Sequence, residues 1–164
     1  MALLPVWGQS GDYFIPFRLL LLSRMIERET SRDLSRFSVT VAEWRVLSQC
    51  CSMGSSSAAE ICAAFEADRA EVSRAVAGLL KAGLIQREPD SSHRQKMRIT
   101  PTDAGWEIFE GVRVMRDAYF NEILQDLDPD ERKAFNAALH SIAVRVDEQR
   151  TLRAKPAEAT DHAD

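Results

Sequence analysis

Two helix starts that lie eleven residues apart constrain the fold of this chain more than any other feature of its sequence. Ser57 and Asp68 each stand three positions before a glutamate, so each can cap a helix while the glutamate reaches back to the capping residue's amide. The pattern predicts a helix over about Ser57–Phe65, a two-residue turn at Glu66–Ala67, and a second helix over Asp68–Ala82. Two helices joined by so short a turn form a helix-turn-helix.

The same capping pattern marks two further helix starts. Thr40 precedes a glutamate by three positions, and so does Asp128. Pro129 then occupies the first helical position, where a missing amide hydrogen costs nothing. Apolar residues recur at helical spacing in the other long segments, which predicts helices over about Ile15–Phe37, Thr102–Asp128 and Pro129–Arg150.

A β-hairpin is expected directly after the helix pair. Ala82–Gly83 resembles a helix C-cap, and short strands are predicted at Leu84–Arg87 and Gln95–Ile99. The segment between them, Glu88–His93, is polar and turn-prone. The hairpin carries four basic residues in a stretch of twelve positions: Arg87, Arg94, Lys96 and Arg98.

The charge of the chain is unevenly distributed. The formal net charge is −4, yet Asp68–Arg98 carries +3 and the remaining residues carry −7. This basic segment is therefore the candidate nucleic-acid-binding surface. We interpret the hairpin as a wing, in which Arg94 near the tip can insert into a narrow minor groove, where the negative potential favours guanidinium. A solvated basic hairpin is the alternative.

Composition and motifs narrow the class of protein. The chain is 45% hydrophobic and 28% charged, and no apolar run approaches the ~20 residues that span a bilayer, so we expect a globular protein without a membrane segment. Pro16 and Arg18 interrupt the apolar run Phe14–Leu22, which also lacks the flanking residues of a signal peptide. We therefore expect the protein to be located in the cytoplasm. The three histidines, three cysteines and seven glycines form no catalytic, metal-binding or phosphate-binding signature. We therefore expect neither an enzyme nor a cofactor or metal site.

The outer face of the second helix of the pair is small and basic. At about 100° per residue, the apolar positions share one side of the helix. Small residues allow a helix to approach the major groove closely, and Ser73 or Arg74 can reach base edges or phosphates. A solvated helix face would show the same pattern. The opposite side from the apolar residues carries Ala70, Ser73, Arg74, Ala77, Gly78 and Lys81.

In order and spacing, residues from about Leu34–Phe109 resemble the MarR family of transcriptional regulators. Val39–Leu47 is similar to the family's second helix, and Arg69–Ile85 is similar to its recognition helix and following strand. Pro89–Lys96 falls where members carry an Asp-Arg-Arg signature at the wing tip, and Thr102–Gly105 resembles the start of their fifth helix. The resemblance implies a mainly α fold with a small β-hairpin wing, in which a winged helix-turn-helix core is flanked by N- and C-terminal dimerisation helices.

Domain boundaries and DNA contacts follow from the pattern and the resemblance together. We expect an N-terminal dimerisation helix over 1–38, a DNA-binding lobe over 39–101, C-terminal dimerisation helices over 102–150 and a disordered tail over 151–164. The expected contacts to double-stranded DNA are Ser57, Arg69, Ala70, Ser73, Arg74, Ala77, Lys81, Arg87, His93, Arg94, Gln95, Lys96 and Arg98.

The wing departs from the family pattern at two positions. His93 stands where members usually have Asp, and Gln95 stands where a second Arg is frequent, so that only Arg94 is kept. His93 either orients Arg94 by hydrogen bonding, adds a pH-dependent charge near DNA, or is a loop residue without a role.

The resemblance also implies a homodimer, formed by the first helix and the last two helices of each subunit. The outer segments carry more apolar surface than a small winged-helix core needs, which independently favours a partner. Two-fold symmetry predicts a pseudo-palindromic operator with half-sites about one helical turn apart. The expected interface residues are Phe14, Phe17, Leu127, Phe135, Leu139 and Ile142.

Members of this family are often released from DNA by phenolic or other aromatic acids, which bind between the dimerisation helices and the DNA-binding lobe. The resemblance thus implies a repressor with such an effector. An aromatic carboxylate needs a flat apolar slot and a cationic anchor. The alternative is that Trp44 and Met115 are ordinary core and that Arg18 is a surface charge. The candidate contacts are Arg18, Trp44, Met115 and Tyr119.

Two other functions remain open. Some relatives sense oxidants through cysteine, and Cys50, Cys51 and Cys62 lie in neighbouring predicted helices; three buried structural cysteines are the alternative. A winged-helix module that binds protein instead of DNA is also compatible with the fold. Such a module would lack the basic residues that this chain carries on its second helix and hairpin.

Overall fold

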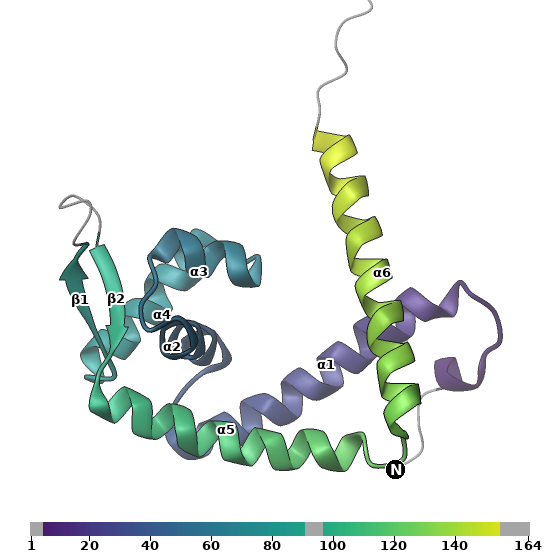
Figure 1. The fold of residues 1–164 in the computed structure, drawn as a ribbon, viewed down its shortest axis with the longest axis horizontal. Helices are drawn as coiled ribbons and strands as arrows, with labels where there is room; N and C mark the ends of the chain where they lie inside the picture. The colour runs from purple at the N-terminus through teal and green to yellow at the C-terminus, as the bar shows by residue number, and fades with distance from the viewer. Residues whose placement is uncertain (1–4, 91–96, 155–164) are drawn as a thin grey trace, which may run out of the picture. The chain divides into compact units, whose positions relative to one another are not determined.

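The computed structural model describes residues 5–90 and 97–154, and Figure 1 shows how their helices and strands follow one another. The chain divides into two compact units, residues 1–117 and 118–164, each considered by itself below. Among the described residues, no helix is both long and apolar enough to cross a membrane. The described elements are the short 3-10 helices Pro5–Gly8 and Ser35–Phe37, the helices α1 Phe14–Leu34, α2 Val41–Met53, α3 Ala58–Phe65, α4 Arg69–Lys81, α5 Asp103–Ile123 and α6 Pro129–Ala154, and the strands β1 Ile85–Pro89 and β2 Met97–Pro101.

Three helix starts form by the reciprocal capping that their sequence predicts. The side chains of Thr40 and Ser57 accept hydrogen bonds from the glutamate amides three positions on, at 3.2 and 3.3 Å. Each glutamate accepts in return from the amide of its capping residue, at 2.9 and 2.8 Å. Asp128 caps α6 in the same way.

The start of α4 is capped differently. Asp68 accepts hydrogen bonds from the amides of Ala70 and Glu71, at 2.7 and 3.2 Å. The Glu71 carboxylate, which the sequence pattern assigns to the amide of Asp68, lies 3.5 Å from Nη1 of Arg45 in α2. The prediction was wrong about this carboxylate because its partner comes from another helix.

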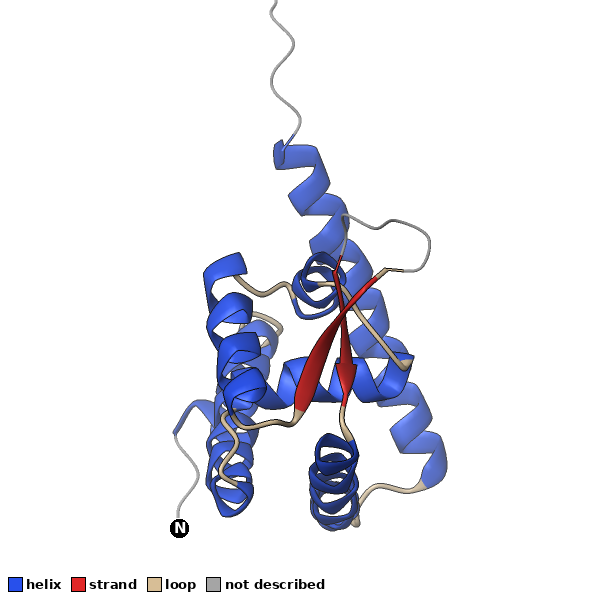
Figure 2. Cartoon of the chain, turned by 90° about the vertical axis from the view of Figure 1, so that its left-hand side faces the viewer, coloured by secondary structure: helices blue, strands red, loops and turns tan. Residues whose placement is uncertain are grey.

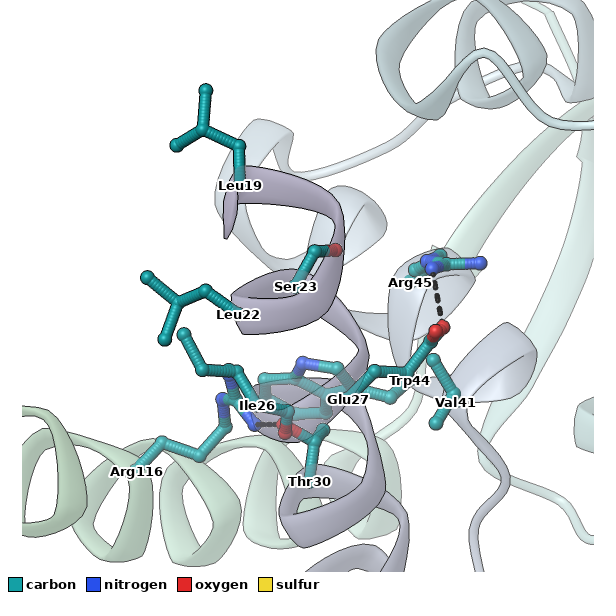
Figure 3. A pocket seen from close by; sticks show the side chains of 10 residues that line it. All are labelled: Leu19, Leu22, Ser23, Ile26, Glu27, Thr30, Val41, Trp44, Arg45 and Arg116. Carbon is teal, nitrogen blue, oxygen red and sulfur yellow. Dashed lines mark hydrogen bonds and ion pairs between the residues drawn. The ribbon is translucent and has the colours of Figure 1, made fainter. Parts of the chain in front are cut away.

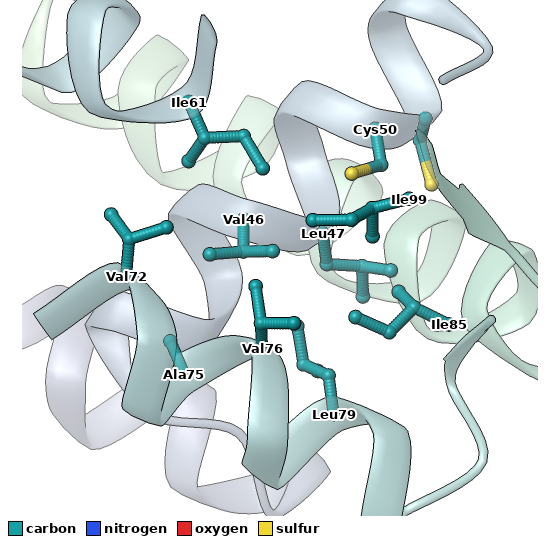
Figure 4. Close-up of a cluster of buried hydrophobic side chains, with 11 residues drawn as sticks. Val46, Leu47, Cys50, Ile61, Val72, Ala75, Val76, Leu79, Ile85 and Ile99 are labelled. Carbon is teal, nitrogen blue, oxygen red and sulfur yellow. The ribbon is translucent and has the colours of Figure 1, made fainter. Parts of the chain in front are cut away.

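One hydrophobic core joins α2, α3, α4 and the hairpin (Figure 4). Burying a valine, leucine or isoleucine side chain contributes roughly 1.5–3 kcal/mol, so this cluster fixes which side of each helix faces inward. The turn between α3 and α4 closes tightly, because Glu66 adopts a left-handed conformation (φ 49°) and the amide of Ala67 donates to the carbonyl of Cys62 at 3.0 Å. The core consists of Val46, Leu47, Cys50, Cys51, Ile61, Val72, Ala75, Val76, Leu79, Ile85 and Ile99.

The hairpin is antiparallel and is hydrogen-bonded to the segment before α3; Figure 2 shows its two strands in red. Ser56 donates from its amide to the carbonyl of Ile99 at 3.0 Å and accepts from the amide of Ile99 at 2.8 Å. β1 begins at Ile85, one residue later than predicted, because the amide of Leu84 donates to Leu79 in the turn that ends α4. β2 begins at Met97, and the predicted strand residues before it lie outside the described part of the chain.

The second unit contains the end of α5 and the whole of α6. This last helix has 26 residues and ends at Ala154, beyond the predicted end near Arg150. Its side chains are exposed through Arg153 except for half-buried Leu139, and the exposed ones include Phe135 at 45% and Ile142 at 39%. Residues 155–164 lie outside the described part, so a disordered tail stays a prediction.

Replacing Gly105 by alanine tests the fit of α5 against the helix-turn-helix core. A Cβ here would overlap the carbonyl oxygen of Leu84 and lie 3.3 Å from Cδ1 of Leu47. Overpacking costs about 1–3 kcal/mol, so we expect Gly105→Ala to lower the free energy of unfolding by that amount in urea denaturation. Gly8→Ala is the control, because a Cβ at Gly8 would meet nothing within 4 Å. Equal effects of the two substitutions would contradict this account.

Candidate nucleic-acid interface

The outer face of α4 carries the side chains that the sequence assigns to it. Val72, Val76 and Leu79 are buried in the core, and this fixes the direction in which the rest of the helix points. The exposed side therefore presents two arginines and a lysine with small residues between them, a surface that can approach a major groove closely. Its exposed residues are Arg69, Ala70, Ser73, Arg74, Ala77 and Lys81.

Gly78 is an exception to the predicted outer face. It is half-buried, and a Cβ at this position would overlap Oε1 of Glu43 in α2. The absence of a side chain at Gly78 thus leaves room for the Glu43 carboxylate beside α4. The prediction was wrong because Gly78 lies at the edge of the helix face, where a side chain of the neighbouring helix decides burial.

Arg98 holds the hairpin in place, whereas the sequence places it among the DNA contacts. Its guanidinium donates to both carboxylate oxygens of Glu60 in α3, at 3.1 and 2.8 Å, and to the backbone carbonyl of Ser55 at 2.8 Å. Glu60 also accepts from the amide of Ser57, and this hydrogen bond, with the contribution of Arg98, lowers the pKa of Glu60 below its ordinary value. Arg98 therefore ties β2 to the start of α3 and positions the wing.

The other predicted contacts divide into two groups. Ser57 is half-buried at the start of α3, where its hydroxyl caps the helix, and Arg87 is exposed on β1. The wing-tip residues His93, Arg94, Gln95 and Lys96 lie outside the described residues, so their roles stay predictions.

A cavity of about 490 Å³ lies between α1, α2 and α5 (Figure 3). Trp44 supplies a flat apolar wall, and its ring stacks on Phe109 with 5.6 Å between centroids. Arg116 reaches the cavity from α5 and donates to the hydroxyl of Thr30 at 2.6 Å. The volume lies in the range of small-molecule sites, roughly 300–1,000 Å³. The cavity is lined by Leu19, Leu22, Ser23, Ile26, Glu27, Thr30, Val41, Trp44, Arg45 and Arg116.

Of the four ligand contacts predicted from the sequence, Trp44 is the one that lines this cavity. Arg18 donates to backbone carbonyls of the N-terminal segment before α1, and Met115 is half-buried outside the lining. Tyr119 belongs to the second unit, where its ring lies 5.9 Å from that of Phe120.

The cations of the cavity are Arg45 and Arg116, which sequence reasoning did not select. Their approach depends on the packing of three helices, which no local pattern reveals. The one sequence feature that pointed towards Arg116 was its position directly after Met115, which is a predicted ligand contact.

The cysteines of α2 have the properties of unreactive core thiols. Cys50 and Cys51 are buried, and burial raises their pKa to about 11 and about 12, because apolar surroundings disfavour a thiolate. Cys62 in α3 is half-buried. All three are free thiols in the structure.

Comparisons with known proteins point to one family. The model of the MarR family matches residues 37–96. A MarR/EmrR family transcriptional regulator from Acinetobacter sp. ADP1 has a similar structure, with a TM-score of 0.77 and 21% identity over 85% of this chain and 99% of that one. A MarR protein from Peptoclostridium difficile DA00132 gives 0.76 and 17% over 91% and 95%, and wild-type MarR from E. coli gives 0.66 and 18% over 78% and 95%.

No curated protein matches the chain. The predicted resemblance is nevertheless confirmed, in sequence for residues 37–96 and in fold for most of the chain. The fold is that of MarR-family transcriptional regulators, with a winged helix-turn-helix at its centre.

Thiol reactivity tests the assignment of the core cysteines. We expect Cys62 to react first with a disulfide reagent at pH 8, while Cys50 and Cys51 react only on unfolding, because their raised pKa values leave almost no thiolate. Mass spectrometry of peptides from native and urea-unfolded protein separates the three sites. Modification of Cys50 or Cys51 in the native protein at the rate of a free thiol would contradict the assignment.

The same raised pKa values predict the direction of the pH dependence of folding. The ordinary thiol value is 9.0, so ionisation of these thiols favours the unfolded chain at high pH. The stability they contribute is complete below pH 9 and is lost as the pH rises toward about 11 and 12.

Proposed function

We propose that this winged-helix chain, whose residues 37–96 match the MarR family, is a sequence-specific DNA-binding transcriptional regulator that works as a homodimer in the cytoplasm. The observation that carries the proposal is the exposed face of α4, where Arg69, Arg74 and Lys81 point away from a core that fixes the helix. The basic hairpin bonded to the start of α3 adds a second surface beside it. A dimer would present two such faces to a pseudo-palindromic operator.

The proposal of a homodimer rests on apolar side chains that each subunit leaves in water. On α1, Phe17 and Leu20 are each 62% exposed, and Phe14 is half-buried. On α6, Phe135 and Ile142 are exposed along a helix whose side chains are all exposed through Arg153 except for half-buried Leu139. Because the stability of a helix in water comes mostly from packing of its apolar face, α6 requires a partner. A second copy of this chain is the occupant that we propose.

The cavity between α1, α2 and α5 supports a small aromatic acid as the effector. Trp44 offers a flat apolar wall, and Arg45 and Arg116 offer guanidinium groups to a carboxylate. We propose that the dimer acts as a repressor by covering promoter DNA, and that the effector changes the separation of the two α4 helices so that both no longer fit the groove.

Two alternatives have less support. A thiol-based redox switch needs an accessible thiolate, and the raised pKa values of Cys50 and Cys51 disfavour one at both positions. A protein-binding module has no need of the exposed basic face on α4. Specific DNA binding, insensitive to peroxide and weakened by aromatic acids, would favour the proposed function over both.

Substitutions of two arginines distinguish a DNA contact from a positioning residue. We expect Arg74→Ala to weaken operator binding by about 1–3 kcal/mol, and, if Arg74 contacts a phosphate, to reduce the slope of log affinity against log salt by about 1. Arg98→Ala should also weaken binding, because the wing loses its tie to Glu60, but it should leave the salt slope unchanged. Both the operator affinity and the salt slope can be measured by fluorescence anisotropy across a salt series, with DNA from the region upstream of the gene that encodes this chain.

Arg113→Ala is the matched control for these substitutions, because Arg113 is exposed on α5 and pairs there with Glu110 and Asp117. Affinity equal to wild type in Arg74→Ala would remove α4 from the interface. No preference of the wild-type dimer for any genomic fragment over unrelated DNA would overturn the proposed function.

A charge placed on the apolar face of α6 tests the dimer. Phe135→Glu should convert the protein to a monomer at micromolar concentration, because an unpaired carboxylate would have to be buried in an apolar interface. Sedimentation velocity reports the mass. Asn136→Glu, at the next exposed position, adds the same charge and should leave the dimer intact. A dimer that survives Phe135→Glu would place the interface elsewhere.

A further inference from the structure

Arg45 of α2 pairs with carboxylates from two other helices. Its Nη2 lies 3.1 Å from Oε1 of Glu27 in α1, and its Nη1 lies 3.5 Å from Oε1 of Glu71 in α4. Figure 3 shows the first of these pairs at the edge of the cavity, with Glu27 and Arg45 both in its lining. One guanidinium thus joins a cavity-lining helix to the helix with the exposed basic face.

Glu71 lies where a small displacement matters most for α4. It is in the first turn of the helix, and its amide is held by the Asp68 cap at 3.2 Å. The exposed residues Ala70, Ser73 and Arg74 stand within three positions of it. A change at the Glu71 carboxylate therefore acts on the same turn that presents these side chains.

A ligand in the large cavity has access to Arg45 on the side of Glu27. On the side of Glu71, the space between Arg45 and the helix-turn-helix is only about 10 Å³, at the lower limit for a single water molecule. An effector would therefore influence Glu71 through Arg45 and not by direct contact.

We propose that Arg45 couples the cavity to α4, and that a ligand carboxylate in the cavity draws the guanidinium away from Glu71. The guanidinium serves two carboxylates through its two Nη atoms, so a third carboxylate in the cavity competes with both for its position and its donors. The contact to Glu71 is the longer of the two, at 3.5 Å against 3.1 Å, and is the one that gives way. This inference rests on the proposed function, because it assigns a route by which an effector reaches the DNA-binding face.

The route can be tested without any ligand. Glu27→Gln removes the competitor for Arg45, strengthens the pair with Glu71 and should raise operator affinity. Glu29→Gln is the matched control, because Glu29 lies on the same helix and pairs with Arg32, so this change removes the same charge without touching Arg45. Since exposed ion pairs each contribute little, we expect Glu27→Gln to bind DNA about two- to fivefold more tightly than Glu29→Gln.

The difference between these two variants should vanish when Arg45 is replaced. Arg45→Met keeps the aliphatic stem and removes the guanidinium, and in this background Glu27→Gln and Glu29→Gln should bind alike. Glu71→Gln is a second background with the same expectation, should Arg45→Met fail to fold by circular dichroism. A difference that persists in either background, or no difference with Arg45 and Glu71 both intact, would overturn the coupling.

The coupling can also be tested with two ligands, benzoate and benzamide, which share a ring and differ in charge. Benzoate should weaken operator binding of the wild-type dimer and have at least fivefold less effect on Arg45→Met, whereas benzamide should have little effect on either. Equal release of wild type and Arg45→Met by benzoate would overturn the coupling while leaving an acid-responsive regulator. A wild-type protein without specific DNA binding would instead overturn the proposed function, and the inference with it.

Discussion

The packing of α4 on α2 is the interaction on which the rest of this structure depends. Val76 and Leu79 are buried in one cluster with Val46 and Leu47, and Gly78 leaves room for the Glu43 side chain of α2. Because α4 has one buried stripe, this contact decides which of its side chains stay in water. The same helix α2 carries Trp44 and Arg45 to the cavity on its other side. A single helix thus supports both the candidate DNA-binding face and the candidate effector site.

Arginines connect the elements that surround this core. Arg98 links β2 to α3, Arg45 links α2 to α1 and α4, and Arg116 links α5 to α1 through the hydroxyl of Thr30. These side chains are partly exposed, so each ion pair contributes little to stability. They instead fix the orientation of the elements that they join, because a planar guanidinium with several donors can hold two elements at a defined angle.

Interactions between residues close in the sequence could be predicted from it, whereas ion pairs and hydrogen bonds between distant residues could not. The capping residues Thr40, Ser57 and Asp128 and the buried stripe of α4 depend on neighbours within a few positions, so their patterns predicted the helices and the outward face. The partners of Arg98 and Arg45 lie 18 to 43 residues away. No periodicity records such pairs, so the sequence indicated neither the tie of Arg98 to Glu60 nor the place of Arg45 in the cavity lining. The partners of Arg18 are backbone carbonyls of another segment, which the sequence pattern did not indicate either.

Glu60 takes part in two structures at once, since one carboxylate accepts both from the amide that begins α3 and from the arginine that anchors β2. Each interaction restrains the carboxylate that the other one uses. The first turn of α3 and the base of the hairpin are therefore coupled through one side chain, so that loss of one loosens the other.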